Sequence, residues 1–226
     1  VTVRNSIVQS TAGWGIGAAF GEITGANSVV RNIAVFNNTV PEGQSALMGV
    51  FKKGSLKLSN IMAAGNTGAA RVLTVTTSGN EACTGFTATD IFTDEEAVVP
   101  DNDSVGTILE TTAFTSGEAA YLANSRDVAQ KWAMLSGESY PSFAAADTAL
   151  PVRVTFTATD TTDPENSTTA YYYTDNTGVL IGIDDTFIAS ATWDYEGDLK
   201  TAVFSENATI TGSFTTCDHQ WSDWTH

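Results

Sequence analysis

Apolar stretches separated by short polar phrases recur along the first third of the chain, and the phrases resemble one another. They are TVRNSIVQS from residue 2, VVRNIAVFNN from residue 29 and KLSNIMAAG from residue 57. Asn5, Asn32 and Asn60 therefore share one register, at offsets of 27 and 28 residues. A period of about 20 to 50 residues is typical of solenoids, because one unit cannot bury its apolar face until a neighbour stacks on it. The pattern predicts stacked units.

Each unit also contains a second apolar or β-branched stretch, at residues 13–23, 45–57 and 69–79. Glycine, asparagine and serine lie between the stretches, so each unit offers at least two short strands joined by turns. We expect an all-β fold with a short capping helix, in which a right-handed parallel β-helix of about four coils comes first. The asparagines would stack at one corner, because a buried amide needs several hydrogen-bond partners. Three unrelated turn asparagines are the alternative interpretation.

A fourth unit with a shifted spacing is found in CTGFTATDIF, residues 83–92. Aligned with the other units, it has Gly85 in the asparagine position and Phe86 at the position of Ile33 and Ile61. The acidic residues 94–104 that follow predict a long loop.

The segment after the acidic loop is expected to close the solenoid, because an uncovered last coil exposes strand edges and core. Thr115 and Glu118 have the spacing of a capping box in front of AAYLAN, which predicts a short helix lying over the end of the last coil. The side chains expected to pack there are Ala119, Ala120, Tyr121, Leu122, Trp132, Leu135 and Tyr140. The β-helix and its cap would together occupy residues 1–148.

A second all-β unit is expected over residues 151–216, after the small-residue boundary AAADTALP. Its strand-like stretches are residues 152–159, 170–183, 189–197 and 208–214. Turn signals separate these stretches, and the clearest of them is Asp175-Asn176-Thr177-Gly178.

Parts of the chain resemble known modules. The run Ser116-Gly117-Glu118-Ala119-Ala120-Tyr121-Leu122, with Trp132 and Ser139-Tyr140-Pro141 after it, resembles the segment that closes β-helical stretches in large surface proteins of gut Firmicutes and Bacteroides. Residues 151–216, with VTF, YYTDNTGVL and FSENATITGSF, resemble the Listeria–Bacteroides repeat, a β-grasp-like spacer module. Residues 217–226, CDHQWSDWTH, resemble the opening of a Cys/His-containing module of the same proteins. The resemblance implies an extracellular, cell-surface location, with signal and anchor outside this fragment, and implies no activity.

The net charge of −16 is distributed unevenly. Residues 1–85 carry +3, whereas residues 86–150 carry −9 and residues 151–226 carry −10. Nucleic acid is not expected as a partner, because neutralising phosphates requires clustered Lys and Arg. Nor is membrane insertion within this fragment expected, because the chain has no apolar run of spanning length.

The residues needed for common catalytic sites are scarce, and we expect no enzyme activity and no cofactor. Residues 1–85 contain no Asp and only three Glu, whereas glycoside hydrolysis needs two carboxyl groups flanking the bond. Both histidines lie in the last eight residues, which argues against a Ser-His or Cys-His nucleophile. Cys83 and Cys217 are far apart and do not indicate a disulfide framework.

Metal binding is a weaker hypothesis. Carboxylates cluster in TDEEAVVPDNDS, from Asp94 to Asp103, and in DYEGD, from Asp194 to Asp198, and irregular loops of this kind can hold Ca²⁺. Neither cluster has EF-hand spacing, so solvated acidic loops are the alternative. Cys217, His219 and His226 are zinc ligand types, but a closed structural site needs four ligands.

The positive balance of the repeats indicates a candidate ligand-binding site made of Arg4, Arg31, Lys52, Lys53 and Lys57. Arg4 and Arg31 occupy equivalent repeat positions and would stack one coil apart. Such a patch could bind an anionic ligand, for example sialic acid, uronic acid or a host protein. The ordinary polar exterior of a solenoid is the alternative.

These observations favour a non-catalytic fragment of a bacterial cell-surface adhesin, whose stacked strands present a rigid surface to a host glycan or a host surface or secreted protein. Two alternatives remain open. The fragment could be the C-terminal, non-catalytic part of a polysaccharide lyase or hydrolase, or a purely structural spacer.

Overall fold

The protein is mostly β-strand with few helices. The computed structural model describes residues 2–4, 17–75, 83–95, 106–159, 167–182 and 192–196. The strands are β1 (Thr2–Arg4), β2 (Phe20–Phe36), β3 (Thr39–Ala64), β4 (Thr67–Val75), β5 (Cys83–Thr93), β6 (Thr107–Ile108), β7 (Trp132–Ala133), β8 (Ser142–Phe143), β9 (Arg153–Thr159), β10 (Ser167–Tyr173) and β11 (Thr192–Glu196). The helices are α1 (Thr111–Thr115) and α2 (Glu118–Asn124).

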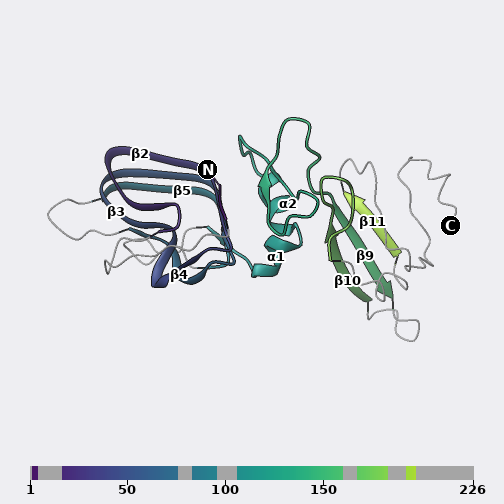
Figure 1. Cartoon of the computed structure of the whole chain (residues 1–226). Helices are drawn as coiled ribbons and strands as arrows, with labels where there is room; N and C mark the ends of the chain where they lie inside the picture. Colours follow the sequence, from purple (N-terminus) through teal and green to yellow (C-terminus); the bar gives the residue numbers. More distant parts are fainter. Residues whose placement is uncertain are drawn as a thin grey trace.

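The first half of the chain forms one parallel sheet with the strand order β1-β2-β3-β5-β6, in which β4 also pairs with β3. Ile33 of β2 pairs with Ile61 of β3, and Ile61 pairs with Ile91 of β5. The first of these offsets is the 28 residues that separate Asn32 from Asn60 in the sequence. Figure 1 shows β2, β3 and β5 running alongside one another. The sequence repeat is thus also the pairing repeat of the sheet.

The fourth unit pairs in a different register from the one predicted. Gly85 lies opposite Ser55 and Phe86 opposite Leu56, whereas Ile91 takes the position expected for Phe86. Asp90 therefore occupies the asparagine position. Its φ of 55° matches the 52° of Asn60, and only Gly, Asn and Asp adopt this left-handed conformation routinely.

The register predicted for the first unit is also wrong. Arg4 pairs with Phe36, not with Arg31, so the two arginines do not occupy equivalent positions. The phrases around them are alike in composition, but strand pairing follows the packing of both faces, and a short phrase does not fix it. Asn5 lies outside the described residues.

Side chains at the ends of β2, β3 and β5 alternate between two cores. One core lies inside the stack of strands and includes Ile33, Val35, Ile61, Ala63 and Ile91. The other lies on the opposite face and includes Ala34, Phe36, Met62, Ala64 and Phe92. Because successive side chains of a strand point to opposite faces, the second core is built on the outside of the stack.

The cap segment covers this outer face. The prediction that it lies over the end of the last coil is therefore wrong. Six buried residues of the cap belong to the second core and pack against side chains from all three stacked strands: Phe114, Ala119, Ala120, Ala123, Trp132 and Met134. In Figure 1, α1 and α2 lie beside the stack of strands. Of the residues expected to pack, Ala119, Ala120 and Trp132 are buried in this core, and Leu122 and Tyr140 pack against it. Tyr121 and Leu135 are half-buried and do not belong to it.

The predicted capping box is absent. The capping position before α2 is occupied by Gly117, with φ of 92°, which has no side chain to accept a hydrogen bond. Thr115 belongs to α1 instead, where its hydroxyl donates to the carbonyl oxygen of Thr112. A Cβ at position 117 would lie 3.1 Å from the Cβ of Tyr173, so glycine permits both the left-handed turn and the close approach.

The C-terminal part forms an antiparallel sheet with the order β10-β9-β11. The predicted turn at Asp175 is confirmed, since the Gly178 amide donates to the Asp175 carbonyl oxygen at 3.1 Å. Burial tends to raise the pKa of the Asp175 carboxyl, but hydrogen bonds from Thr177, Val179 and Ser136 lower it overall. The predicted strand at 208–214 and residues 217–226 lie outside the described residues. In the described part of the chain, neither helix has the length and apolar character to span a membrane.

Candidate ligand-binding surface

A regular array of side chains covers one face of β2, β3 and β5. Paired residues in successive strands form three rows, which are Asn27–Ser55–Gly85, Val29–Lys57–Thr87 and Arg31–Ser59–Thr89. All nine positions are exposed or half-buried, whereas Val30, Leu56 and Leu58 between them are buried. Neighbouring strands lie about 4.8 Å apart, so the rows place side chains at a fixed spacing. We call these nine residues the outer array.

Arg31 and Lys57 are the predicted site residues that the outer array brings together. Both side chains are exposed. Lys57 pairs with Val29, two residues before Arg31 on the same strand, so the two cations are diagonal neighbours. With strands about 4.8 Å apart and a rise of about 3.3 Å per residue, such a diagonal pair is about 8 Å apart, within reach of two long side chains that contact one ligand.

Lys52 and Lys53 lie on the same strand as Lys57, on the other side of Gly54. The backbone of Lys53 pairs with that of Thr24. Their side chains are outside the described part of the structure, and their predicted role stays a prediction.

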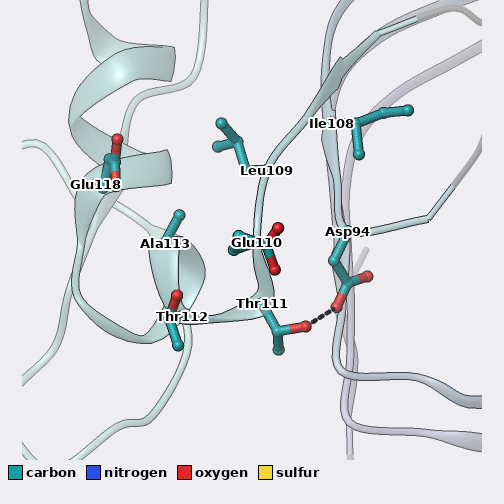
Figure 2. Close-up of a pocket in the computed structure, with 8 residues that line it drawn as sticks. All are labelled: Asp94, Ile108, Leu109, Glu110, Thr111, Thr112, Ala113 and Glu118. Atoms are coloured by element: carbon teal, nitrogen blue, oxygen red, sulfur yellow. Dashed lines mark hydrogen bonds between the residues drawn. The ribbon is translucent and has the colours of Figure 1, made fainter.

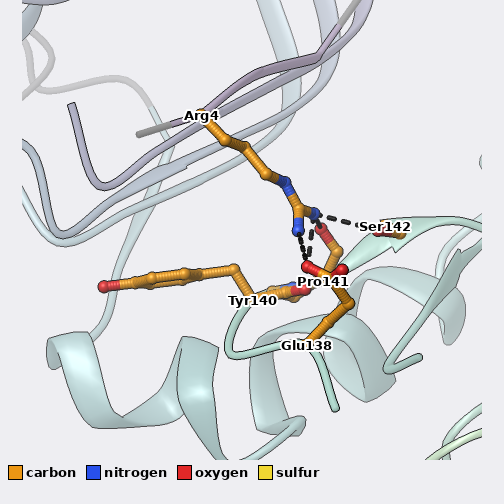
Figure 3. Close-up of polar contacts among 5 residues, drawn as sticks. All are labelled: Arg4, Glu138, Tyr140, Pro141 and Ser142. Carbon is orange, nitrogen blue, oxygen red and sulfur yellow. Dashed lines mark hydrogen bonds and ion pairs between the residues drawn. The ribbon is translucent and has the colours of Figure 1, made fainter. Parts of the chain in front are cut away.

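Arg4 is separated from the other predicted site residues and binds the cap instead (Figure 3). Its guanidinium donates to Glu138 at 2.9 Å, to the hydroxyl of Ser142 at 3.0 Å and to the carbonyl oxygens of Tyr140 and Pro141. It also lies 5.3 Å from the ring centre of Phe36. Burial lowers the pKa of Arg4, and the charge and hydrogen bond of Glu138 partly oppose this. These contacts make Arg4 a structural link between β1 and the cap.

The asparagine stack is confirmed for its two described members. The Asn60 amide donates to Asn32 Oδ1 at 2.9 Å and to the Gln130 carbonyl oxygen at 2.8 Å. Asn60 Oδ1 accepts a hydrogen bond from Trp132 Nε1 at 2.6 Å. The stack therefore continues into the cap. At the same position of the fourth unit, Asp90 Oδ1 lies 3.6 Å from Arg126 Nη1 of the cap.

A second asparagine stack was missed in the sequence. The backbone and side-chain amides of Asn38 both donate to Asn66 Oδ1, at 3.1 and 3.0 Å, and Asn66 Nδ2 donates to the Val35 carbonyl oxygen at 3.0 Å. Both asparagines are buried. The signal was present, because the dipeptide Asn-Thr recurs at residues 38 and 66, 28 residues apart.

Asp94 follows β5 and connects the turn after β3 to helix α1 of the cap. Its Oδ2 accepts hydrogen bonds from the Gly65 amide and from the Thr111 hydroxyl, both at 2.7 Å. An open pocket of about 470 Å³ lies beside this contact (Figure 2). The pocket is lined by Asp94, Ile108, Leu109, Glu110, Thr111, Thr112, Ala113 and Glu118.

Glu95 is the most perturbed acid in the described residues. Burial, helped by the charge of Asp94, raises the pKa of its carboxyl to about 7. No set of three or more His, Cys, Asp or Glu side chains is placed to hold a metal ion in the part of the chain that the structure describes. The Ca²⁺ hypothesis for the acidic loop stays a prediction, since residues 96–105 are outside that part.

Comparison with protein-family models, with curated protein sequences and with solved structures finds no match to this chain.

Proposed function

We propose that this chain is a non-catalytic segment of a bacterial cell-surface adhesin, in which a right-handed parallel β-helix presents a rigid face to a host glycan or protein. The C-terminal sheet would belong to a β-grasp-like spacer module. The extracellular, surface-attached location is part of the same proposal and rests on the resemblance of the cap segment and of residues 151–216.

The observation that carries the proposal is the outer array. Three parallel strands hold exposed Arg31, Lys57, Val29 and hydroxyl side chains in fixed rows. The buried side chains beneath them, Leu56 and Leu58 among them, prevent the rows from moving independently. A pre-organised surface loses little entropy on binding, which suits recognition.

Binding of the purified chain to arrays of host glycans, mucus proteins and serum proteins tests the proposal. We expect saturable binding that the double variant Arg31→Glu/Lys57→Glu abolishes. Lys200→Glu is the control, because it reverses the charge of a lysine in the acidic C-terminal part. Binding that survives the double variant would contradict a site on the outer array.

A structural spacer is the second candidate, and the junction between cap and C-terminal sheet favours it. The backbone amide of Asn176 donates to the Met134 carbonyl oxygen at 2.7 Å. The backbone amide of Ser136 donates to the side-chain oxygen Oδ1 of Asn176, also at 2.7 Å. The Tyr121 and Tyr173 rings lie 5.4 Å apart across the same junction. If the chain binds none of the host glycans, mucus proteins and serum proteins tested, the spacer function is favoured.

A further inference from the structure

We infer that the outer array binds an acidic polysaccharide, one that carries carboxylate groups on its sugar residues, with Arg31 and Lys57 contacting the carboxylates. This inference rests on the proposed function and names the ligand class of the same surface. It follows from the charge, the apolar contact and the hydroxyl groups of the array, taken in turn.

The charge of the array is opposite to that of the protein. The chain carries a net charge of −16, yet none of the nine residues of the array is acidic. Arg31 lies opposite Ser59, and Lys57 lies between Val29 and Thr87. Neither cation therefore has a carboxylate directly across from it or diagonal to it within the array. An anionic ligand therefore fits the charge of this face.

The shape of the cationic groups favours carboxylates. A guanidinium can donate two parallel hydrogen bonds to one carboxylate, and an ammonium can contact a second as a point charge. The two cations occupy neighbouring strands, so a polymer crossing the strands would meet them in succession. Two cations are too few for the phosphate neutralisation that nucleic acids require.

The remaining groups favour a sugar over a simple anion. Val29 is 61% exposed, the highest value among the exposed large hydrophobic residues of the described chain. It lies directly beside Lys57 and two residues from Arg31, so it offers an apolar contact to the C–H face of a sugar ring between the two charges. Ser59, Thr87 and Thr89 add hydroxyl groups that both donate and accept hydrogen bonds.

The test uses the full chain and polygalacturonate, with its fully methyl-esterified form as the neutral counterpart and inorganic polyphosphate as the non-sugar anion. We expect polygalacturonate to bind, and the dissociation constant to rise tenfold or more in Arg31→Gln/Lys57→Gln. Lys200→Gln should leave binding unchanged. Val29→Ser should weaken binding at least threefold while leaving both cations in place.

The outcomes separate this inference from the proposed function. Equal binding of polyphosphate, or of the methyl ester, would overturn the inference. Binding only to neutral glycans or to host proteins, lost in Arg31→Glu/Lys57→Glu, would overturn the inference and leave the adhesin function in place. Binding to nothing would overturn both. An unchanged melting temperature in each variant shows that a loss of binding is not a loss of folding, because all substituted positions of the array are exposed.

Discussion

Asn60 connects two neighbouring repeats and the cap through one side chain. Its amide group donates to Asn32 and Gln130, and its carbonyl oxygen accepts from Trp132. The residue also adopts a left-handed backbone with φ of 52°, which most residues avoid. A single asparagine thus satisfies a conformational and a hydrogen-bonding requirement, and few other residues could replace it.

The variant Asn60→Asp should lower the free energy of unfolding by about 2 to 4 kcal/mol, because it keeps the acceptor for Trp132 and removes both donated hydrogen bonds in a buried position. Urea unfolding followed by tryptophan fluorescence measures the change. The control is Asn37→Asp, which makes the same chemical change at a residue with the same φ of 52° but an exposed side chain. A loss as large in the control would show that the buried hydrogen bonds are not responsible.

The carboxyl of Glu95 makes stability depend on pH. Its pKa is raised by burial and by Asp94 to about 7, above the ordinary value of 4.5, so folding favours the protonated form. The resulting contribution to stability is full below about pH 4.5 and is lost as the pH rises through 7.

We expect Glu95→Gln to stabilise the protein at pH 8 by on the order of 1 to 2 kcal/mol and to have little effect at pH 5, after allowance for partial solvent screening. Melting temperatures of wild type and variant between pH 5 and 8 measure this. Curves that stay parallel over that range would rule out Glu95 as the titrating group. Glu110→Gln, at an exposed position of the pocket beside Asp94, is the matched control.

Strand β3 shows how one element serves two cores and a surface. Lys57 points outward in the array, whereas Met62 is fully buried under the cap and Ile61 is fully buried inside the stack. The left-handed residue at position 60 lies between these two parts of the strand. The same strand therefore carries the candidate surface and the attachment of the cap.

Met62→Glu should detach the cap from the outer face of the stack. A carboxylate there would be buried without a partner, and we expect a loss of on the order of 3 kcal/mol or more. Limited proteolysis should then cleave within residues 106–150 faster than in wild type. Lys57→Glu, on the exposed part of the same strand, should leave the cleavage rate unchanged. Resistance of the Met62 variant would mean that the cap does not depend on this face.

The cap contacts both the parallel sheet and the C-terminal sheet, and so connects two parts that could otherwise move independently. Within the cap, the ring centres of Trp132 and Phe143 lie 4.2 Å apart. Across the junction, the guanidinium carbon of Arg153 in β9 lies 5.4 Å from the ring centre of Tyr121 in α2. Such contacts across a small junction resemble those between domains of one chain, which are usually modest in strength.

The double variant Tyr121→Ala/Asn176→Ala should uncouple the C-terminal sheet from the rest of the molecule. The variant loses the Tyr121–Tyr173 ring contact and the hydrogen bond from Ser136 to Asn176. We expect calorimetry to show two transitions in place of one, with the sheet unfolding several degrees lower. The control is Val29→Ala, at an exposed position of β2 that is not part of the junction, and it should keep the calorimetric transition of the wild type. A single unshifted transition in the double variant would show that the junction does not couple the two parts.

The β-rich class, the 28-residue offset that joins Asn32 to Asn60, the turn at Asp175 and most of the residues that pack in the cap were predictable from the sequence. These features depend on local composition and on a repeat that pairing reproduces directly. Arg31 and Lys57 were both candidate site residues in the sequence, but the repeat grouped Arg31 with Arg4, and only the strand pairing makes Arg31 a diagonal neighbour of Lys57.

The registers of Arg4 and Asp90, and the face that the cap covers, depend instead on tertiary packing. Arg4 aligns with Phe36 because its guanidinium packs on that ring and bonds the loop at residues 138–142, which is distant in sequence. The cap packs on the outer face because Phe36, Met62 and Phe92 place apolar side chains there, and the cap buries them. Both outcomes depend on contacts between distant segments, and a one-residue change of register moves a side chain to the other face, so a local pattern cannot specify them.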